Sequence, residues 1–198
     1  DPELTAAAYA EIRDQVVAIS HGTGSVANLA IAADLAEDSM ILIPAAWYSG
    51  WTDTSIAPGI VHNGAPYCLE AMSILDWMKD ESGVEAPTLA IASLPGDFGL
   101  DSAAGAQKWA EINGVEVVDA GIGKILPGQD NTPIGAAIAA SGADLVFVTT
   151  TPTTFAEVYG TAVASGFVAL WSGGGPTFNP AFIGPDSPIA EPIQRDWY

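Results

Sequence analysis

The sequence predicts an α/β fold with two lobes, in which parallel sheets are flanked by helices. Short apolar runs alternate with helical runs along most of the chain, the order typical of βαβ units with right-handed crossovers. The apolar runs are continuous rather than alternating, as expected for parallel strands covered on both faces. One long segment without periodicity, Trp47–Asn63, separates the second run from the third. Because loops of that length are uncommon inside compact domains, we expect a boundary between lobes there.

The elements follow from apolar runs and helix-end signals. Asp1 suits a helix N-cap and Pro2 the first helical position. Thr132-Pro133 and Thr151-Pro152 predict two later helix starts. The expected strands are Val16–Ser20, Met40–Pro44, Thr88–Ser93, Val115–Asp119, Asp144–Thr149 and Phe167–Trp171. The expected later helices are Ser25–Glu37, Ala65–Ser82, Ser102–Asn113, Ile134–Ser141 and Thr153–Ser165.

The expected domain boundaries come from changes in composition. Residues 1–64 form part of the first lobe and residues 65–175 form the second. After the glycine run Gly173–Gly175, Pro and Gly dominate. Residues 176–198 are therefore predicted to be a crossover or tail.

Composition excludes several classes of function. The formal net charge is −19, with 24 acidic and 5 basic side chains. Such a surface repels nucleic-acid phosphates and anionic lipids, so we expect no nucleic-acid partner. No apolar stretch approaches the ~20 residues that span a bilayer, so we expect no direct membrane insertion. Cys68 is the single cysteine, and we interpret it as a small buried residue.

The turn Ser20–Ser25, between a strand and a helix, is the first candidate binding site. Backbone N–H groups at a helix start, beside the hydroxyls of Thr23 and Ser25, suit a carboxylate or phosphate. Ser25 could be either the N-cap or a ligand donor. The run G-T-G-S-V-A also approximates a dinucleotide fingerprint, but the next strand lacks the acidic residue that holds a ribose. A merely tight turn is the third interpretation.

Four further candidates also follow strands, where ligands of open α/β sheets bind. Trp47 and Tyr48 either stack on a ligand or pack between the lobes. The others are Phe98 within Ser93–Asp101, the hydroxyls of Thr149–Thr151, and Trp171 with the glycine run after it.

Catalytic and metal sites are not predicted. The chain contains no G-x-S-x-G elbow, and His21 and His62 lack metal-ligand spacing. His21 could orient a carboxylate or be structural. We therefore expect no enzyme activity, no cofactor and no metal.

The order of segments resembles a known family over about residues 1–175. The segments are VVAISHGTGSVANLAIAADLAEDSMILIPAAW, APYCLEAMSILDWM, TLAIASLPGDFGLDSAAGAQKWAEINGVEVV and DNTPIGAAIAASGADLVFV. They are similar to the branched-chain amino acid-type (Leu/Ile/Val-type) substrate-binding proteins of ABC transporters, which have a periplasmic-binding-protein fold. The D-F-G segment and the A-D-L-V-F-V strand are the most specific of them.

The resemblance implies a receptor that holds a small ligand between two lobes. The first lobe would hold the ligand carboxylate, and aromatic and hydroxyl residues of the second would close over it by hinge motion. The implied contact residues are Ser25, Ala46, Trp47, Phe98, Thr150, Thr151, Asn63 and Tyr67.

Two positions depart from the family pattern. Trp171–Gly175 stands where amino-acid binders place a carboxylate for the ligand ammonium, and Trp47 stands where they place a small hydroxyl residue. Because a buried ammonium without an anionic partner is costly, an aromatic or otherwise hydrophobic carboxylate, or an uncharged polar solute, becomes a better candidate ligand than an aliphatic amino acid.

The family is longer than this chain, so the first lobe is expected to be incomplete, through truncation or a companion chain. The expected partners are an amino acid or organic acid and a membrane permease. The expected location is periplasmic or extracellular, with anchoring, as in a lipoprotein, through a segment before Asp1. A ligand-sensing regulatory domain on the same fold and a nucleotide-dependent enzyme are the alternatives.

Overall fold

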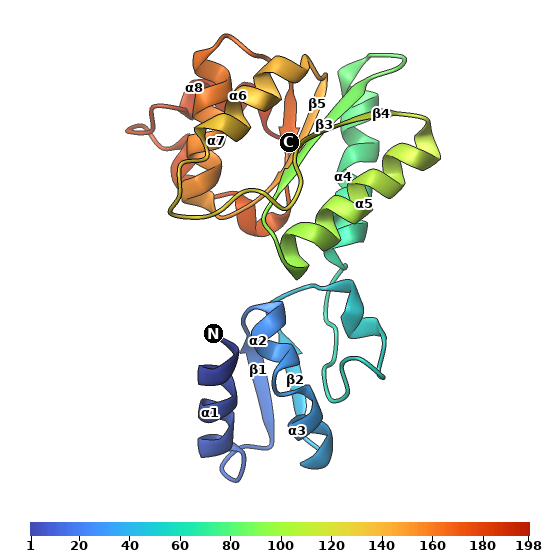
Figure 1. The fold of residues 1–198 in the computed structure, drawn as a ribbon, viewed down its shortest axis with the longest axis vertical. Helices are drawn as coiled ribbons and strands as arrows, with labels where there is room; N and C mark the ends of the chain where they lie inside the picture. The colour runs from blue at the N-terminus through green and yellow to red at the C-terminus, as the bar shows by residue number, and fades with distance from the viewer. The chain divides into compact units, whose positions relative to one another are not determined.

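The computed structural model describes all residues from Asp1 to Tyr198 and divides into two compact units, Asp1–Tyr67 and Cys68–Tyr198 (Figure 1). Each unit has its own parallel sheet: two strands in the first and four in the second. The predicted α/β class with parallel sheets flanked by helices is confirmed.

The first unit is built around two parallel strands, β1 (Ala18–Gly22) and β2 (Ile41–Pro44), with Ile19 beside Leu42 in the register. Its other elements are α1 (Pro2–Ile12), α2 (Ser25–Leu29), α3 (Ala32–Glu37) and the 3₁₀ turn η1 (Ser49–Thr52). The Asp1 side chain accepts hydrogen bonds from the backbone N–H groups of Glu3 and Leu4, as predicted for an N-cap.

Two predictions for this unit are wrong. The single helix expected over Ser25–Glu37 is two helices, because Ile31 leaves the helical conformation (φ −112°, ψ 2°) and packs in the core at 2% exposure. The strands are also not covered on both faces. Leu42 is buried, whereas Ile41 and Ile43 on the opposite face are 47% and 37% exposed. Successive strand side chains point to opposite faces, so helices cover one face of this sheet.

The second unit has the strand order β4-β3-β5-β6, all parallel. Figure 1 shows α4 and α5 on one face of this sheet and α6, α7 and α8 on the other. Along β3 and β5 every apolar residue is buried, and the side chains alternate between two cores. The bounds are α4 Tyr67–Ser82, β3 Thr88–Ser93, α5 Asp97–Asn113, β4 Glu116–Gly121, α6 Thr132–Ser141, β5 Leu145–Thr149, α7 Pro152–Ala164 and β6 Leu170–Ser172.

Several helices start at other residues than predicted: α4 at Tyr67 rather than Ala65, α6 at Thr132 rather than Ile134 and α7 at Pro152 rather than Thr153. Helix α5 begins at Asp97 rather than Ser102, and it includes Gly99, where a Cβ would lie 2.1 Å from the Leu94 carbonyl oxygen. Only glycine permits that approach. The N-cap of α6 is Asn131, not Thr132. Thr132 is already helical, and its backbone N–H and hydroxyl both donate to Asp130 Oδ1.

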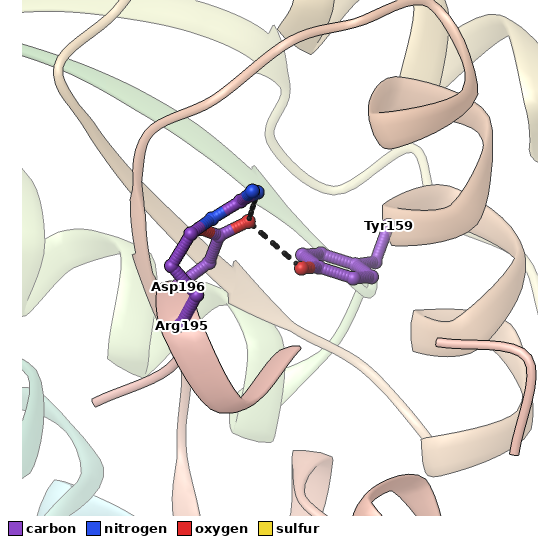
Figure 2. Close-up of polar contacts among 3 residues, drawn as sticks. All are labelled: Tyr159, Arg195 and Asp196. Atoms are coloured by element: carbon purple, nitrogen blue, oxygen red, sulfur yellow. Dashed lines mark hydrogen bonds and ion pairs between the residues drawn. The ribbon is translucent and has the colours of Figure 1, made fainter. Parts of the chain in front are cut away.

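Residues 176–198 belong to the second unit. They contain part of η2 (Gly175–Thr177), η3 (Pro180–Ile183) and α8 (Ala190–Asp196). The Tyr198 N–H donates to the Trp171 carbonyl at 2.9 Å, which extends the sheet beyond β6. Figure 2 shows the contact that holds α8: Tyr159 Oη of α7 donates to Asp196 Oδ2 at 2.9 Å. Within α8, Arg195 Nε lies 2.5 Å from Asp196 Oδ1.

Candidate functional site

The end of β1, which leads into the turn, is shaped by one residue with unusual backbone geometry. His21 has φ 63°, and the β1–β2 register shifts between Ser20 and Gly22. The Gly22 carbonyl then accepts hydrogen bonds from Asn28 Nδ2 at 2.8 Å and from the Ala45 N–H at 2.9 Å. These bonds fix the start of α2 to β2, so the turn has a defined shape.

Ser25 lies at the first position of α2, and Gly24 is the N-cap. Of the two roles considered for Ser25, the N-cap is therefore wrong. Ser25 is buried at 7% exposure, but its hydroxyl is not one of the buried polar atoms that lack a hydrogen-bond partner. Thr23 is exposed, and its hydroxyl donates to the His21 carbonyl at 3.2 Å. Helix α2 has only five residues, so its dipole is small and the first backbone N–H groups are the main donors.

An aromatic corner follows β2 in the same unit. The Trp47 and Tyr67 rings meet edge to face with centroids 6.2 Å apart, and the Tyr67 N–H donates to the Trp47 carbonyl at 2.7 Å. Gly64 fits beneath the indole, because a Cβ there would lie 2.4 Å from Trp47 Nε1. Ala46 is buried, and its carbonyl accepts from Trp51 Nε1 at 2.7 Å.

Tyr48 and Asn63, two further predicted ligand contacts of this unit, differ in their surroundings. Tyr48 packs edge to face on Trp51, with centroids 5.4 Å apart. Asn63 is exposed.

The second unit brings together loops at the carboxyl ends of β3, β5 and β6. The Leu94 N–H donates to the Thr149 carbonyl at 2.9 Å, which joins the ends of β3 and β5. The Thr150 N–H donates to Thr177 Oγ1 at 3.2 Å. The Thr150 hydroxyl is buried and has no hydrogen-bond partner. Thr151 is exposed at the N-cap of α7, with its hydroxyl 3.1 Å from that of Thr154.

Trp171 is a core residue, which corrects its assignment as a ligand contact. It is fully buried and meets Phe155, Tyr159 and Phe167 edge to face, with centroids 5.0–6.2 Å apart. Strand alternation explains the outcome, because the side chain of a residue in β6 points into the layer between the sheet and its helices. The loop after the strand, not Trp171, reaches the edge of the sheet.

Glu70 is the functional candidate that sequence reasoning missed. Its Oε1 accepts a hydrogen bond from the Gly175 N–H at 2.8 Å. The glycine run, which itself offers no acidic residue, thus has a carboxylate beside it. Partial burial raises the pKa of the Glu70 carboxyl above its usual value, and the Gly175 hydrogen bond opposes that rise. Sequence spacing gives no signal for this contact, because Glu70 and Gly175 lie 105 residues apart.

Two other properties bear on the chemistry of the chain. No group of three or more His, Cys, Asp or Glu side chains is placed to share a metal ion. None of the helices is both long and apolar enough to cross a bilayer.

Comparison with known proteins gives one sequence family and several related structures. The profile of the family described as periplasmic binding protein matches residues 1–182. A comparison with curated protein sequences finds no match.

Three related structures illustrate the structural similarity. A fatty acid ABC transporter substrate-binding protein from Thermomonospora curvata is 24% identical with a TM-score of 0.84, covering 100% of this chain and 49% of that one. A solute-binding protein from Rhodopseudomonas palustris HaA2 in complex with p-hydroxybenzoic acid is 19% identical with a TM-score of 0.77, covering 98% of this chain and 58% of that one. A branched-chain amino acid ABC transporter protein from Thermus thermophilus with bound valine is 20% identical with a TM-score of 0.76, covering 92% of this chain and 47% of that one. These similarities show a shared fold, and the chain spans about half the length of these proteins.

Proposed function

Because the chain belongs to the periplasmic binding protein family, we propose that it is the ligand-binding part of an extracytoplasmic solute-binding protein. In this proposal the protein captures a small carboxylic acid and delivers it to the membrane permease of an ABC transporter. It binds the acid without chemical change. Anchoring to the membrane belongs to the same proposal.

The observation that carries the proposal is the position of Ser25 at the first residue of α2, where its hydroxyl and the first backbone N–H groups of the helix are available donors. A ligand carboxylate would accept from this hydroxyl and from the neighbouring backbone N–H groups. The ligands named for the compared proteins, a fatty acid, p-hydroxybenzoic acid and valine, all carry a carboxyl group. That shared chemistry supports a carboxylic acid here.

The apolar part of the ligand would contact aromatic side chains. Trp47 offers its ring in the first unit, and Phe98 follows β3 in the second. We propose a mechanism in which the ligand docks on the first unit and the second closes over it by hinge motion. The other proposed contacts are Thr23, Ala46, Tyr48, Asn63, Tyr67, Thr150 and Thr151.

A ligand screen by thermal unfolding of the full-length protein tests this proposal. A carboxylic acid present at 100 times its Kd stabilises the folded state by about 2.7 kcal/mol. Replacing Ser25→Ala should weaken acid binding about 10-fold, the value of one hydrogen bond to a charged group. Ser55→Ala is the matched control, because that serine is exposed and bonds Asp53 in the same unit. The proposal fails if no carboxylic acid raises the melting temperature.

A further inference from the structure

Asn63 and Gly64 form an Asn-Gly pair in which no hydrogen bond protects the reactive groups. The Gly64 N–H donates no hydrogen bond within the chain, and the side-chain amide of Asn63 makes none either. Asn63 is exposed and lies outside every helix and strand. A glycine after an asparagine also leaves its own nitrogen unshielded, because it has no side chain. The Gly64 nitrogen is therefore accessible to the side-chain carbonyl carbon of Asn63.

The second Asn-Gly pair of the chain, Asn113-Gly114, lies in the opposite environment. It stands at the carboxyl end of α5, where the Gly114 N–H donates to the Ala110 carbonyl. Asn113 Nδ2 donates to the Trp109 carbonyl at 3.0 Å, and Asn113 Oδ1 accepts from Lys79 Nζ at 3.2 Å. Hydrogen bonds thus hold both the nitrogen and the amide at the end of the helix. This pair is an internal reference with the same two residue types.

Packing against Trp47 explains why a bulkier residue cannot replace Gly64 and slow a reaction there. A Cβ built on Gly64 would lie 2.4 Å from Trp47 Nε1 and 2.7 Å from Trp47 Cδ1, closer than real Cβ atoms approach other atoms. The indole is itself packed edge to face on Tyr67, with ring centroids 6.2 Å apart. The aromatic corner therefore requires a glycine directly after Asn63.

We propose that Asn63 is a site of spontaneous deamidation, which alters the candidate binding site of the first unit as the protein ages. In the first step the Gly64 nitrogen bonds to the side-chain carbonyl carbon of Asn63 and closes a succinimide ring. The carbon–nitrogen bond of the side-chain amide breaks, and that nitrogen leaves as ammonia with the proton of the Gly64 N–H. Water then opens the ring at either carbonyl. One route gives aspartate, and the other gives isoaspartate, in which the main chain runs through Cβ.

Both products place a carboxylate at a position that is a proposed ligand contact. Because like charges repel, the modified protein should bind a carboxylic acid more weakly than the unmodified protein. Isoaspartate also adds one carbon to the main chain directly before Gly64, where the Trp47 indole leaves no room for a Cβ. This effect on binding rests on the proposed function, whereas the reaction itself does not.

Peptide mapping by mass spectrometry tests the reaction on the full-length protein, incubated in warm and mildly alkaline buffer with and without urea. The ratio of the deamidation rate at Asn63 to that at Asn113 should be at least about 10-fold larger in the folded protein than in urea, the factor for breaking two hydrogen bonds at Asn113-Gly114. Isoaspartate should appear at Asn63, which identifies the succinimide route. A ratio that urea leaves unchanged, or an Asn63 that stays intact in the folded protein, overturns the proposal.

Calorimetric titration with the strongest acid from the ligand screen tests the effect on binding. Wild type that mapping shows to be converted should bind about 5-fold more weakly than fresh protein, the effect of one like charge a few ångströms away in water. Asn63→Gln keeps a side-chain amide but reacts far more slowly, because its ring needs one more atom, so incubation should not weaken its binding relative to its own fresh form.

The outcomes distinguish this inference from the proposed function. Equal affinity of fresh and converted wild type overturns the effect on the candidate site and leaves carboxylic acid capture standing. A loss of affinity on incubation that Asn63→Gln shares with wild type overturns it as well, because the loss then has another origin. Failure of fresh protein to bind any acid overturns the proposed function and the effect on binding, but not the reaction, which mapping measures alone.

Discussion

Two Tyr–Asp–Arg clusters, one in each unit, allow a stability prediction with an internal control. In the second unit Tyr159 donates to Asp196 at 2.9 Å, and the Asp196 side chain is 2% exposed. In the first unit Tyr9 donates to Asp38 at 2.7 Å, and the Asp38 side chain is 18% exposed. Each aspartate also pairs with an arginine. The two clusters therefore share their chemistry and differ in the burial of the acceptor.

Replacing Tyr159→Phe should cost more than replacing Tyr9→Phe. Asp196 would lose a hydrogen bond to a buried charge, which is worth about 1.5–3 kcal/mol, and water cannot readily take the place of the hydroxyl. We expect a loss of about 2 kcal/mol, or roughly 6–10 °C in the melting temperature of a unit of this size. At Asp38 water can reach the vacated position, so the expected loss is about 1 kcal/mol or less.

Thermal and urea unfolding of the two variants, followed by circular dichroism, measure this difference. A fall in the free energy of unfolding for Tyr159→Phe that is equal to or smaller than that for Tyr9→Phe would refute the reasoning. Burial of the aspartate would then not control the value of its hydrogen bond.

Three other predictions follow from single positions. Burial and the Asp38 hydrogen bond raise the pKa of Tyr9 to about 12, above the unfolded value of about 10. The contribution of Tyr9 to the free energy of unfolding should therefore be present below pH 10 and be lost between pH 10 and 12. Unfolding measured against pH should show this loss in the wild type and not in Tyr9→Phe. Gly135→Ala should destabilise the protein by about 1–3 kcal/mol, because its Cβ would lie 2.5 Å from the Val158 carbonyl oxygen. At Gly160 the nearest atom to a new Cβ lies 4.0 Å away, so Gly160→Ala should stabilise the protein by about 0.5–1 kcal/mol in the same urea melts. Phe98→Ala should weaken carboxylic acid binding about 10-fold in calorimetric titrations, and unchanged affinity would remove Phe98 from the proposed site.

Local sequence patterns predicted most of the second unit. The strand Thr88–Ser93 has the predicted bounds, because a continuous apolar run is what a strand buried on both faces requires. Sequence patterns failed to predict the bounds of helices where tertiary packing determines them. Ile31 breaks a helix to reach the core, and Gly99 permits α5 to start early against Leu94. Neither effect has a periodicity that a sequence window can detect.

The candidate site was only partly predictable from the sequence. The turn that holds Ser25 was found because a strand followed by glycines and hydroxyl residues is a local signal. The contact between Glu70 and Gly175 joins positions 105 residues apart, so nothing local indicates it. Trp171 was assigned to the site because it ends a strand, but strand alternation places its side chain in the core.

The most direct test of carboxylic acid capture compares an acid with its own methyl ester. Calorimetric titration of the full-length protein with the strongest acid from the ligand screen, and then with the ester, measures the value of the carboxylate alone. We predict that the ester binds at least about 10-fold more weakly, and that Ser25→Ala removes most of this difference. Equal affinity for the acid and the ester, or a difference that Ser25→Ala leaves unchanged, would contradict the proposed role of the turn after β1.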